Sequence, residues 1–452
     1  MAETSSSSAS GTTQAPRVLP PGIIWPFILL TSLFAWWGLA NNMTDTLLPT
    51  FKRIMSMSDS TTARIQVVCY LFGYGFLAIP GAIFIKKYTY KSGVLLGLGL
   101  YSLGAILFFP AAQTANFYVY LFAIWIVFSG LSILETAANP YIISMGPEET
   151  ATRRLNFAQS FNPMGSIMGV IISQAFILSN LNIASAEERA AMSPVQLDAI
   201  KAGELRAVSM TYMTIGLILV VTWILIAINK KMPRTHEQRG SLHVWASFQR
   251  LFRNRHYMWG VFAQFFYVGA QIGVWSFIVR YAMQELKLEE LVASGGGGGK
   301  TAEQMAATYY IASLILFVAS RFVCTYLMKY IKPGNLLAIL AGLAIALCIP
   351  VIYVGGLVGV YAMVGISGCM SLMFPTIFGL AVRGLGEDTK IASSLQIMAI
   401  AGAAVITQIE GYVSTKTGSI NLAYWVPLLC FVFIAYYGAV ACRKDLSVKV
   451  ST

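Results

Sequence analysis

The chain has 452 residues, of which 57% are hydrophobic and only 11% are Asp, Glu, Lys or Arg, and its mean hydropathy is +0.67. Soluble domains are about 25% charged, so this composition excludes a soluble multidomain protein. The formal net charge is +12. Basic loops of a membrane protein account for such an excess, so we expect no nucleic-acid binding.

Cysteine and histidine are arranged in a way that argues against a metal centre. The six cysteines stand singly in or beside apolar runs, and the three histidines share one basic stretch. No CxxC pair or HExxH motif occurs, so neither disulfides nor a metal site is indicated. We expect no cofactor and no metal, and a membrane-embedded enzyme is disfavoured because no nucleophile–base pair lies in the apolar segments.

Residues 1–23 are polar and rich in Ser and Thr, which predicts a disordered cytoplasmic tail. They lack the pattern of a cleavable signal peptide. Apolar runs follow, each about 20 residues long and therefore able to cross a bilayer as a helix. The twelve predicted spans are 24–49, 62–85, 93–112, 117–145, 155–180, 207–229, 257–281, 305–330, 334–353, 357–382, 391–412 and 421–442.

The longest basic connection, 230–256, carries seven of the 31 Lys and Arg residues. It separates an N-terminal six-helix half, 24–229, from a C-terminal six-helix half, 257–442, and residues 443–452 form a cytoplasmic tail. Such a chain is an all-α membrane protein of the kind built from two pseudo-symmetric halves. Lys and Arg accumulate on the side of this connection, so both termini are predicted to be cytoplasmic in a plasma or bacterial inner membrane, with the basic loops on anionic lipid.

Three local features refine this layout. The amphipathic connection 181–206 predicts a short surface helix, and the glycine run 294–300 predicts a flexible external linker. Gly165 and Gly169 in span five allow a close approach of another helix. No segment predicts a β-strand.

Ionisable residues at membrane depth cost on the order of 2.5–3.5 kcal/mol and therefore indicate function. Asp45 in span one and Glu135 in span four are the main candidates. Glu410 lies near the outer end of span eleven with Lys416 close by, so a structural role is expected there. We expect Arg321 to make a gate or interface contact.

Amide and aromatic side chains share helical faces with these acids. Asn42 and Asp45 lie on one face of span one, and Asn139 follows Glu135 by one turn. Amides donate and accept hydrogen bonds as sugar hydroxyls do, and aromatic rings cover the C–H face of a sugar. The predicted substrate-binding residues are Trp37, Asn41, Asn42, Asn139, Gln159, Asn162, Gln264, Tyr267, Gln271 and Trp275.

Few cations line these faces, so a neutral polyhydroxylated ligand, a monosaccharide, is favoured over a phosphate or carboxylate. A buried carboxyl group binds a proton readily because burial disfavours its charged form. Asp45 and Glu135 are therefore predicted to carry the proton of a sugar symporter, in an order that the residues leave open. A sodium-coupled sugar transporter and a non-transporting sugar sensor remain alternatives, and a drug/proton antiporter fits less well.

Several long strings of this sequence resemble the fucose:proton symporters of the major facilitator superfamily. They are LANNMTDTLLPTF (39–51), LETAANPYI (134–142), LNFAQSFNPMG (155–165), AQFFYVGAQIGVWSFIVRYA (263–282), FPTIFGLAVRGLGEDTK (374–390) and GYVSTKTG (411–418). The resemblance covers essentially all twelve spans. It implies a twelve-helix fold, alternating access and proton-coupled sugar uptake, and we expect a monomer.

The resemblance also assigns residues and shows two departures. It links Asp45 and Glu135 to proton coupling and sugar recognition, and it places Gln159 and Asn162 at the sugar site. Ile85 stands where the superfamily's loop after span two usually has an acid, so the cytoplasmic gate must close through other contacts. Phe374 stands where the fucose permeases have a tyrosine.

Overall fold

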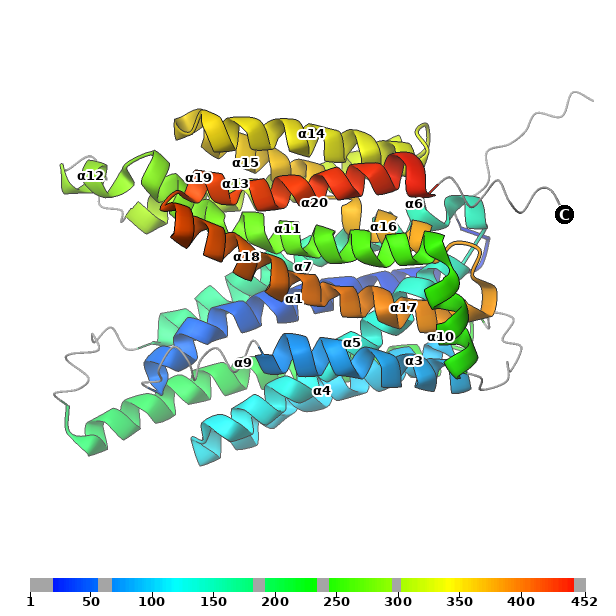
Figure 1. Cartoon of the computed structure of the whole chain (residues 1–452). Coiled ribbons are helices and arrows are strands. Elements are labelled where there is room, and N and C mark those ends of the chain that lie inside the picture. The colour runs from blue at the N-terminus through cyan, green and yellow to red at the C-terminus, as the bar shows by residue number, and fades with distance from the viewer. Residues whose placement is uncertain (1–18, 56–66, 182–191, 234–243, 295–301, 443–452) are drawn as a thin grey trace, which may run out of the picture.

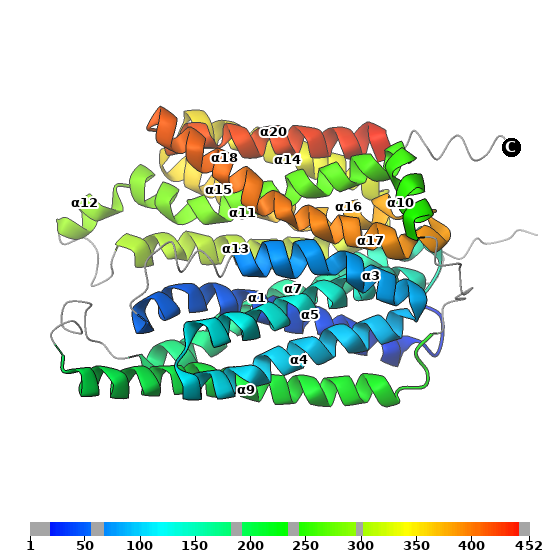
Figure 2. The same ribbon diagram turned by 60° about the horizontal axis from the view of Figure 1, so that its bottom comes forward.

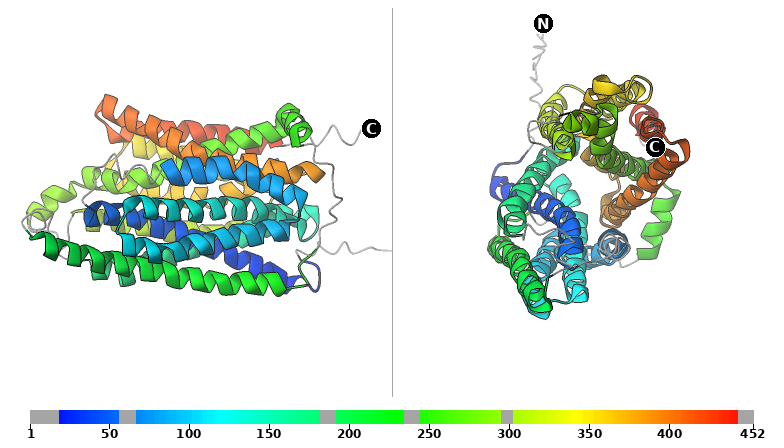
Figure 3. Two further views of the ribbon diagram at one scale, coloured as in Figure 1. Left: turned by 90° about the horizontal axis from the view of Figure 1, so that it is seen from below. Right: turned by 90° about the vertical axis from the view of Figure 1, so that its left-hand side faces the viewer.

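The computed structural model describes residues 19–55, 67–181, 192–233, 244–294 and 302–442. Within these ranges the chain is helical throughout, with no strand (Figure 1). The predicted tails lie outside the described residues, except for 19–23, and so does nearly all of the glycine run 294–300. The helices form two bundles that lie side by side, as the view along their length shows (Figure 3).

The N-terminal half contains six spans, several of which are interrupted. They are α1 (Ile24–Ile54); η1 (Val67–Phe76) with α3 (Leu77–Lys87); α4 (Tyr90–Thr114); α5 (Phe117–Ser144); η2 (Glu148–Thr150), α6 (Ala151–Gln159), α7 (Phe161–Ile172), η3 (Ser173–Ile177) and η4 (Leu178–Asn180); and α9 (Pro194–Ile228).

The linker helix α10 (Val244–Arg253) precedes the C-terminal half. Its spans are α11 (Arg255–Glu285) followed by the short α12 (Leu288–Ala293); α13 (Ala302–Leu327); α14 (Pro333–Tyr353); α15 (Gly356–Met370) with α16 (Met373–Ala381); η5 (Gly386–Asp388), α17 (Thr389–Met398), η6 (Ala399–Ala401) and α18 (Gly402–Thr417); and α19 (Ile420–Ala423), α20 (Trp425–Tyr436) and η7 (Tyr437–Ala441).

Within the described residues every predicted span overlaps one of these helical stretches, and residues 62–66 of the second predicted span lie outside them. Ten stretches within the described residues are long and apolar enough to cross a membrane, and Ile24–Ala40 of α1 is a shorter apolar segment. The predicted separate surface helix at 181–206 is wrong, because α9 runs unbroken from Pro194 through span six. A capping box of Ser193 and Gln196 starts it, and the helix continues through Gly203 without a break.

Two ends of the molecule are distinguished by the short helices α10 and α12, which lie at opposite ends of the bundles (Figures 1 and 2). We call them the α10 end and the α12 end. The two halves pack together near the α10 end, where α16 contacts α6 and α17 contacts both α3 and α5. These contacts close the α10 end.

Glycines set the closest approach of helices inside each half. A Cβ at Gly165 of α7 would lie 1.8 Å from the Ala35 carbonyl oxygen of α1, and one at Gly38 would lie 2.0 Å from the Asn162 carbonyl oxygen. No side chain fits at either position, so α1 and α7 touch backbone to backbone. The close approach predicted from Gly165 is confirmed, and it brings Asn162 against α1.

Candidate functional site

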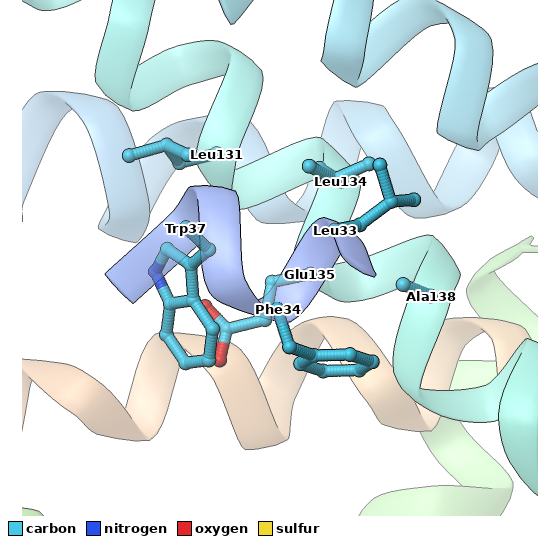
Figure 4. Close-up of a pocket in the computed structure, with 7 residues that line it drawn as sticks. All are labelled: Leu33, Phe34, Trp37, Leu131, Leu134, Glu135 and Ala138. Carbon is cyan, nitrogen blue, oxygen red and sulfur yellow. The ribbon is translucent and has the colours of Figure 1, made fainter. Parts of the chain in front are cut away.

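A small pocket lies between α1 and α5, inside the N-terminal half, and Glu135 reaches into it (Figure 4). Its cavity volume is about 10 Å³, and Leu33, Phe34, Trp37, Leu131, Leu134, Glu135 and Ala138 line it. A space of about 10–15 Å³ holds a single water molecule. A sugar therefore needs more room than this conformation provides.

Glu135 is 3% exposed, and neither carboxyl oxygen has a hydrogen bond of standard geometry among the described residues. The hydroxyl of Tyr74 in η1 interacts with this carboxyl group. The same hydroxyl accepts a 2.7 Å hydrogen bond from the indole nitrogen of Trp37. The acid thus lies in apolar surroundings with one tyrosine beside it, where its neutral form is favoured.

Asn139 and Gln159 continue the polar surface towards the α10 end. Gln159 donates a 2.8 Å hydrogen bond from its side-chain nitrogen to the side-chain oxygen of Asn139, and both residues are buried. The side-chain nitrogen of Asn139 has no partner among the described residues. An unused buried donor one turn from Glu135 suits a ligand oxygen, because such groups are costly when left unpaired.

Two further amides of the N-terminal half are held against the backbone of α1. Asn162 donates to the Phe34 carbonyl oxygen at 3.3 Å, and Asn42 donates to the Gly38 carbonyl oxygen at 3.4 Å. Both are partly buried. Their side-chain oxygens remain available to accept a hydrogen bond.

The predicted stripe of α11 is divided between two environments. Gln264 is fully buried, and its amide oxygen and nitrogen both lack partners among the described residues. Tyr267 donates to the Met370 carbonyl oxygen at 3.1 Å, and Trp275 donates to the Ser367 hydroxyl at 3.2 Å. The Tyr267 hydroxyl and the Trp275 indole nitrogen therefore form their hydrogen bonds within the C-terminal half. Gln271 is only partly buried.

Phe374 connects the aromatic residues of the two halves. Its ring centroid lies 6.5 Å from that of Trp37 in α1 and 6.3 Å from that of Tyr267 in α11. The spans that carry Trp37 and Tyr267 thus face each other across one phenylalanine. Trp275 lies apart from this group, with its ring 5.0 Å from the ring of Phe317.

Arg321 of α13 is 3% exposed and joins the two halves. Its guanidinium donates to the Gln159 carbonyl oxygen of α6 at 3.0 Å and also to the Ser371 carbonyl oxygen, and it lies 4.7 Å from the Phe317 ring. The predicted interface contact is confirmed. Cations were expected to be few along the amide faces, and Arg321 is one that contacts the backbone of Gln159 itself.

Other contacts close the α10 end. Asn156 donates to the Thr376 hydroxyl across the halves at 3.1 Å, and Arg383 lies 3.5 Å from the carboxylate of Glu148. The Lys390 ammonium lies 5.2 Å from the Tyr90 ring. These pairs are the contacts that close this end although Ile85 replaces the usual acid.

The linker helix α10 adds to this closure from outside. Lys86 of α3 donates to the Ser247 hydroxyl at 2.7 Å, while Arg250 holds Asp388 of η5 in two hydrogen bonds of 2.6 and 2.8 Å. The hydrogen bond to Asp388 raises the pKa of Arg250 further above its usual value, so this arginine stays charged. The helix therefore links the N-terminal half to the C-terminal half.

Two predicted site residues cannot be placed as side chains. Asn41 and Asp45 belong to α1 by their backbone, but their side chains lie outside what the structure describes. Asp45 follows Gly38 by seven residues, two turns of the same helix. Its role remains a prediction from the sequence.

Glu410, predicted near the outer end of span eleven, lies in α18 seven residues before its last residue, Thr417. It is fully buried, and neither carboxyl oxygen has a hydrogen-bond partner among the described residues. Lys416 lies over the Tyr412 ring at 5.7 Å instead of reaching the acid. The structural role expected of Glu410 therefore does not rest on a contact with Lys416.

Sequence reasoning missed Tyr74 and Gln396. Tyr74 lies in an apolar run of η1, where a tyrosine has no helical pattern to distinguish it from a packing residue. Gln396 of α17 is fully buried, with both amide atoms unpaired among the described residues. A glutamine within the apolar run of span eleven was a usable signal for it. Where the chain is described, no group of three His, Cys, Asp or Glu residues is close enough to hold a metal ion.

Comparisons with known proteins agree with this geometry. Residues 27–408 match the model of the Major Facilitator Superfamily. The chain is 39% identical over 435 residues to the L-fucose-proton symporter of Haemophilus influenzae, covering 93% of this chain and 97% of that one. It is 40% identical over 414 residues to the L-fucose-proton symporter of Escherichia coli K12, covering 91% and 92%.

A solved structure of the superfamily transporter FucP in the outward conformation superposes with a TM-score of 0.85 at 39% identity, covering 93% of this chain and 99% of that one. The chain therefore belongs to the Major Facilitator Superfamily and, within it, to the family of the fucose:proton symporters.

Proposed function

We propose that this protein is a proton-coupled monosaccharide symporter that works by alternating access. The observation that carries the proposal is Glu135, a buried carboxyl group without a hydrogen bond of standard geometry, in a pocket between α1 and α5. Unpaired amide atoms of Asn139 and Gln264 add donors and acceptors for sugar hydroxyls. The names of the two relatives make L-fucose the first sugar to test.

Proton coupling follows from the surroundings of Glu135. A carboxylate there would be desolvated, with only the Tyr74 hydroxyl beside it, so the acid binds a proton in this conformation. When water or a sugar hydroxyl enters the pocket, the charged form gains partners and the proton can leave. Asp45, two turns beyond Gly38 on α1, is proposed as the second proton carrier.

The sugar site is proposed to include polar and aromatic residues of both halves. Asn139, Gln159 and Asn162 would supply hydrogen bonds from the N-terminal half, together with Asn41 and Asn42. Trp37 would cover an apolar face of the ring, as aromatic side chains do in sugar sites. From the C-terminal half, Gln264, Tyr267, Gln271 and Trp275 complete the proposal.

The closed end supports a direction for the transport cycle. The contacts between the halves described above lie near the α10 end, and the FucP structure that superposes well is in the outward conformation. We place the α10 end in the cytoplasm, with both termini, because Lys and Arg concentrate there. The protein is proposed to work as a monomer, with its basic cytoplasmic loops on anionic lipid.

Proteoliposomes test the function directly. Adding L-fucose to the outside of a symporter that takes up proton and sugar together should make the medium alkaline. Glu135→Gln should abolish that change while exchange of labelled sugar down its gradient persists. Alkalinisation of normal size in Glu135→Gln would rule out Glu135 as the coupling acid.

The alternatives predict other outcomes. A sodium-coupled carrier would take up sugar only when sodium is present at fixed pH, and the medium would not become alkaline. A sugar sensor would bind sugar, as a thermal-shift panel of monosaccharides would reveal, but would give no counterflow of labelled sugar.

A further inference from the structure

Glu410 is a second acid that the proposed sugar and proton site does not use. It lies in α18, seven residues before the last residue of that helix, Thr417. At about 1.5 Å per residue this is roughly 10 Å from the α12 end of the helix. Its side chain is fully buried, and neither carboxyl oxygen has a hydrogen-bond partner among the described residues.

The carboxyl group occupies a space left by a glycine of the neighbouring helix. A Cβ at Gly273 of α11 would lie only 2.2 Å from Oε2 of Glu410. One turn before, a Cβ at Gly269 would lie 2.3 Å from Cγ1 of Ile406 in α18. The acid therefore takes part in the tight packing of α11 on α18 in the same way as the apolar Ile406 does.

The groups around Glu410 do not provide a counter-charge in contact with it. The titratable and charged groups near it are Arg280 and Tyr281 of α11, Cys348 of α14, Tyr424 at the end of α19, and Cys430 of α20. Arg280 is exposed, and its guanidinium stacks on the Phe277 ring at 4.3 Å. The Tyr424 hydroxyl also lacks a hydrogen-bond partner among the described residues.

We propose that Glu410 is a proton-binding site in the C-terminal half, separate from the sugar site, and that its bound proton is required for α18 to pack against Gly273 of α11. The carboxylate takes up one proton from water to form a neutral acid, which an apolar helix contact accepts, whereas a carboxylate without a partner does not fit there. Release of the proton requires α18 to separate from α11 so that water reaches the group.

The chain has a structural break that suits such a movement. The 3-10 turn η6 interrupts span eleven between α17 and α18, and α17 is the part that packs against the N-terminal half. Helices bend where their regular hydrogen bonding is interrupted. α18 can thus shift on α11 while α17 keeps its contacts at the α10 end.

Infrared spectroscopy of the full chain in lipid, without sugar, tests the protonation directly. We expect the carbonyl absorption of a protonated carboxyl group at pH 7, and one component of it should be lost in Glu410→Gln. Glu285→Gln is the matched control near the same end of the molecule and should leave that component in place, because Glu285 is only partly buried and already accepts a 2.6 Å hydrogen bond from the Gly356 backbone nitrogen. If Glu410→Gln removes carboxylate absorption instead, the proposal is overturned.

A second measurement tests the link to packing. The folded protein holds a proton on Glu410 that the unfolded chain releases, so stability from this group is present at low pH and decreases as the pH rises. The melting temperature of the wild type should fall between pH 7 and pH 9 more than that of Glu410→Gln. Equal losses in both proteins would contradict the requirement for the proton.

Gly273→Ala and Gly269→Ala separate the acid from general packing. Both add a methyl group to the contact between α11 and α18, but only the first meets the carboxyl group. Gly273→Ala should lower the pH at which the protonated absorption disappears, and Gly269→Ala should leave it unchanged. An equal response to both would show that packing alone sets the signal and would refute the proposal. None of these measurements involves sugar, so they can be interpreted even if the symport proposal fails.

Discussion

Glu135 and Glu410 are buried glutamates of different halves, with nearly the same exposure, and they differ in what surrounds them. Glu135 faces a pocket, with the Tyr74 hydroxyl beside it and amides one turn away. Glu410 lies against Gly273, between helices of a single half. Burial alone therefore does not assign a role, since the same residue type serves a ligand pocket in one place and a helix contact in the other.

The largest difference between the two acids is expected in the coupling of sugar accumulation to proton entry. A membrane potential of 100 mV contributes about 2.3 kcal/mol per proton, which supports roughly fifty-fold sugar accumulation. Glu135→Gln should reduce accumulation in energised vesicles to about one-fold, whereas Glu410→Gln should keep it above about ten-fold. Accumulation of labelled L-fucose measures both, and similar losses in the two variants would remove the distinction.

Through Arg321 the C-terminal half contacts the half that holds Glu135. Substituting Arg321 tests whether this contact keeps the α10 end closed. A hydrogen bond from a charged group contributes about 1.5–3 kcal/mol, so Arg321→Ala should weaken closure of the α10 end about tenfold or more. The readout is oxidative cross-linking of Asn156→Cys with Thr376→Cys, two positions that now share a 3.1 Å hydrogen bond. Lys329→Ala, which changes an exposed cation of the same connection, is the control and should leave cross-linking unchanged.

Alanine substitutions at glycines in helix contacts should lower the melting temperature to different extents. Alanine at Gly165 would meet the Ala35 backbone oxygen, whereas alanine at Gly273 would meet the end of a side chain that can turn aside. Overpacking costs about 1–3 kcal/mol, so Gly165→Ala should lower the melting temperature more than Gly273→Ala does. The opposite order would mean that α1 and α7 adjust more easily than the carboxyl group of Glu410.

The smallest effect is expected from the tyrosines beside the two acids. Tyr74→Phe removes the hydroxyl that accepts a hydrogen bond from the Trp37 indole nitrogen. Such a hydrogen bond contributes about 1 kcal/mol, so sugar binding should weaken about fivefold. Tyr424→Phe removes a hydroxyl without a hydrogen bond in the described residues and should leave sugar affinity unchanged. Isothermal titration with L-fucose separates the two, and equal affinities would remove Tyr74 from the site.

The fold was predictable because each span is an apolar run of membrane length, and bilayers permit few other structures. The buried position of Glu135 and its neighbour Asn139 also followed from helical spacing. The hydrogen bond from Arg321 to the Gln159 carbonyl oxygen was not predictable, because it joins residues 162 positions apart through the packing of two halves. Tyr74 was missed for the same reason: only the folded chain brings it to Trp37.

The unbroken helix α9 has a practical consequence. Its 35 residues span about 52 Å at 1.5 Å per residue, while the hydrocarbon core of a bilayer is about 30 Å thick. Its first turns therefore project beyond the lipid at the α12 end as a rigid extension. An epitope placed there would remain ordered outside the bilayer, and antibody binding to intact cells would reveal which side of the membrane that end faces.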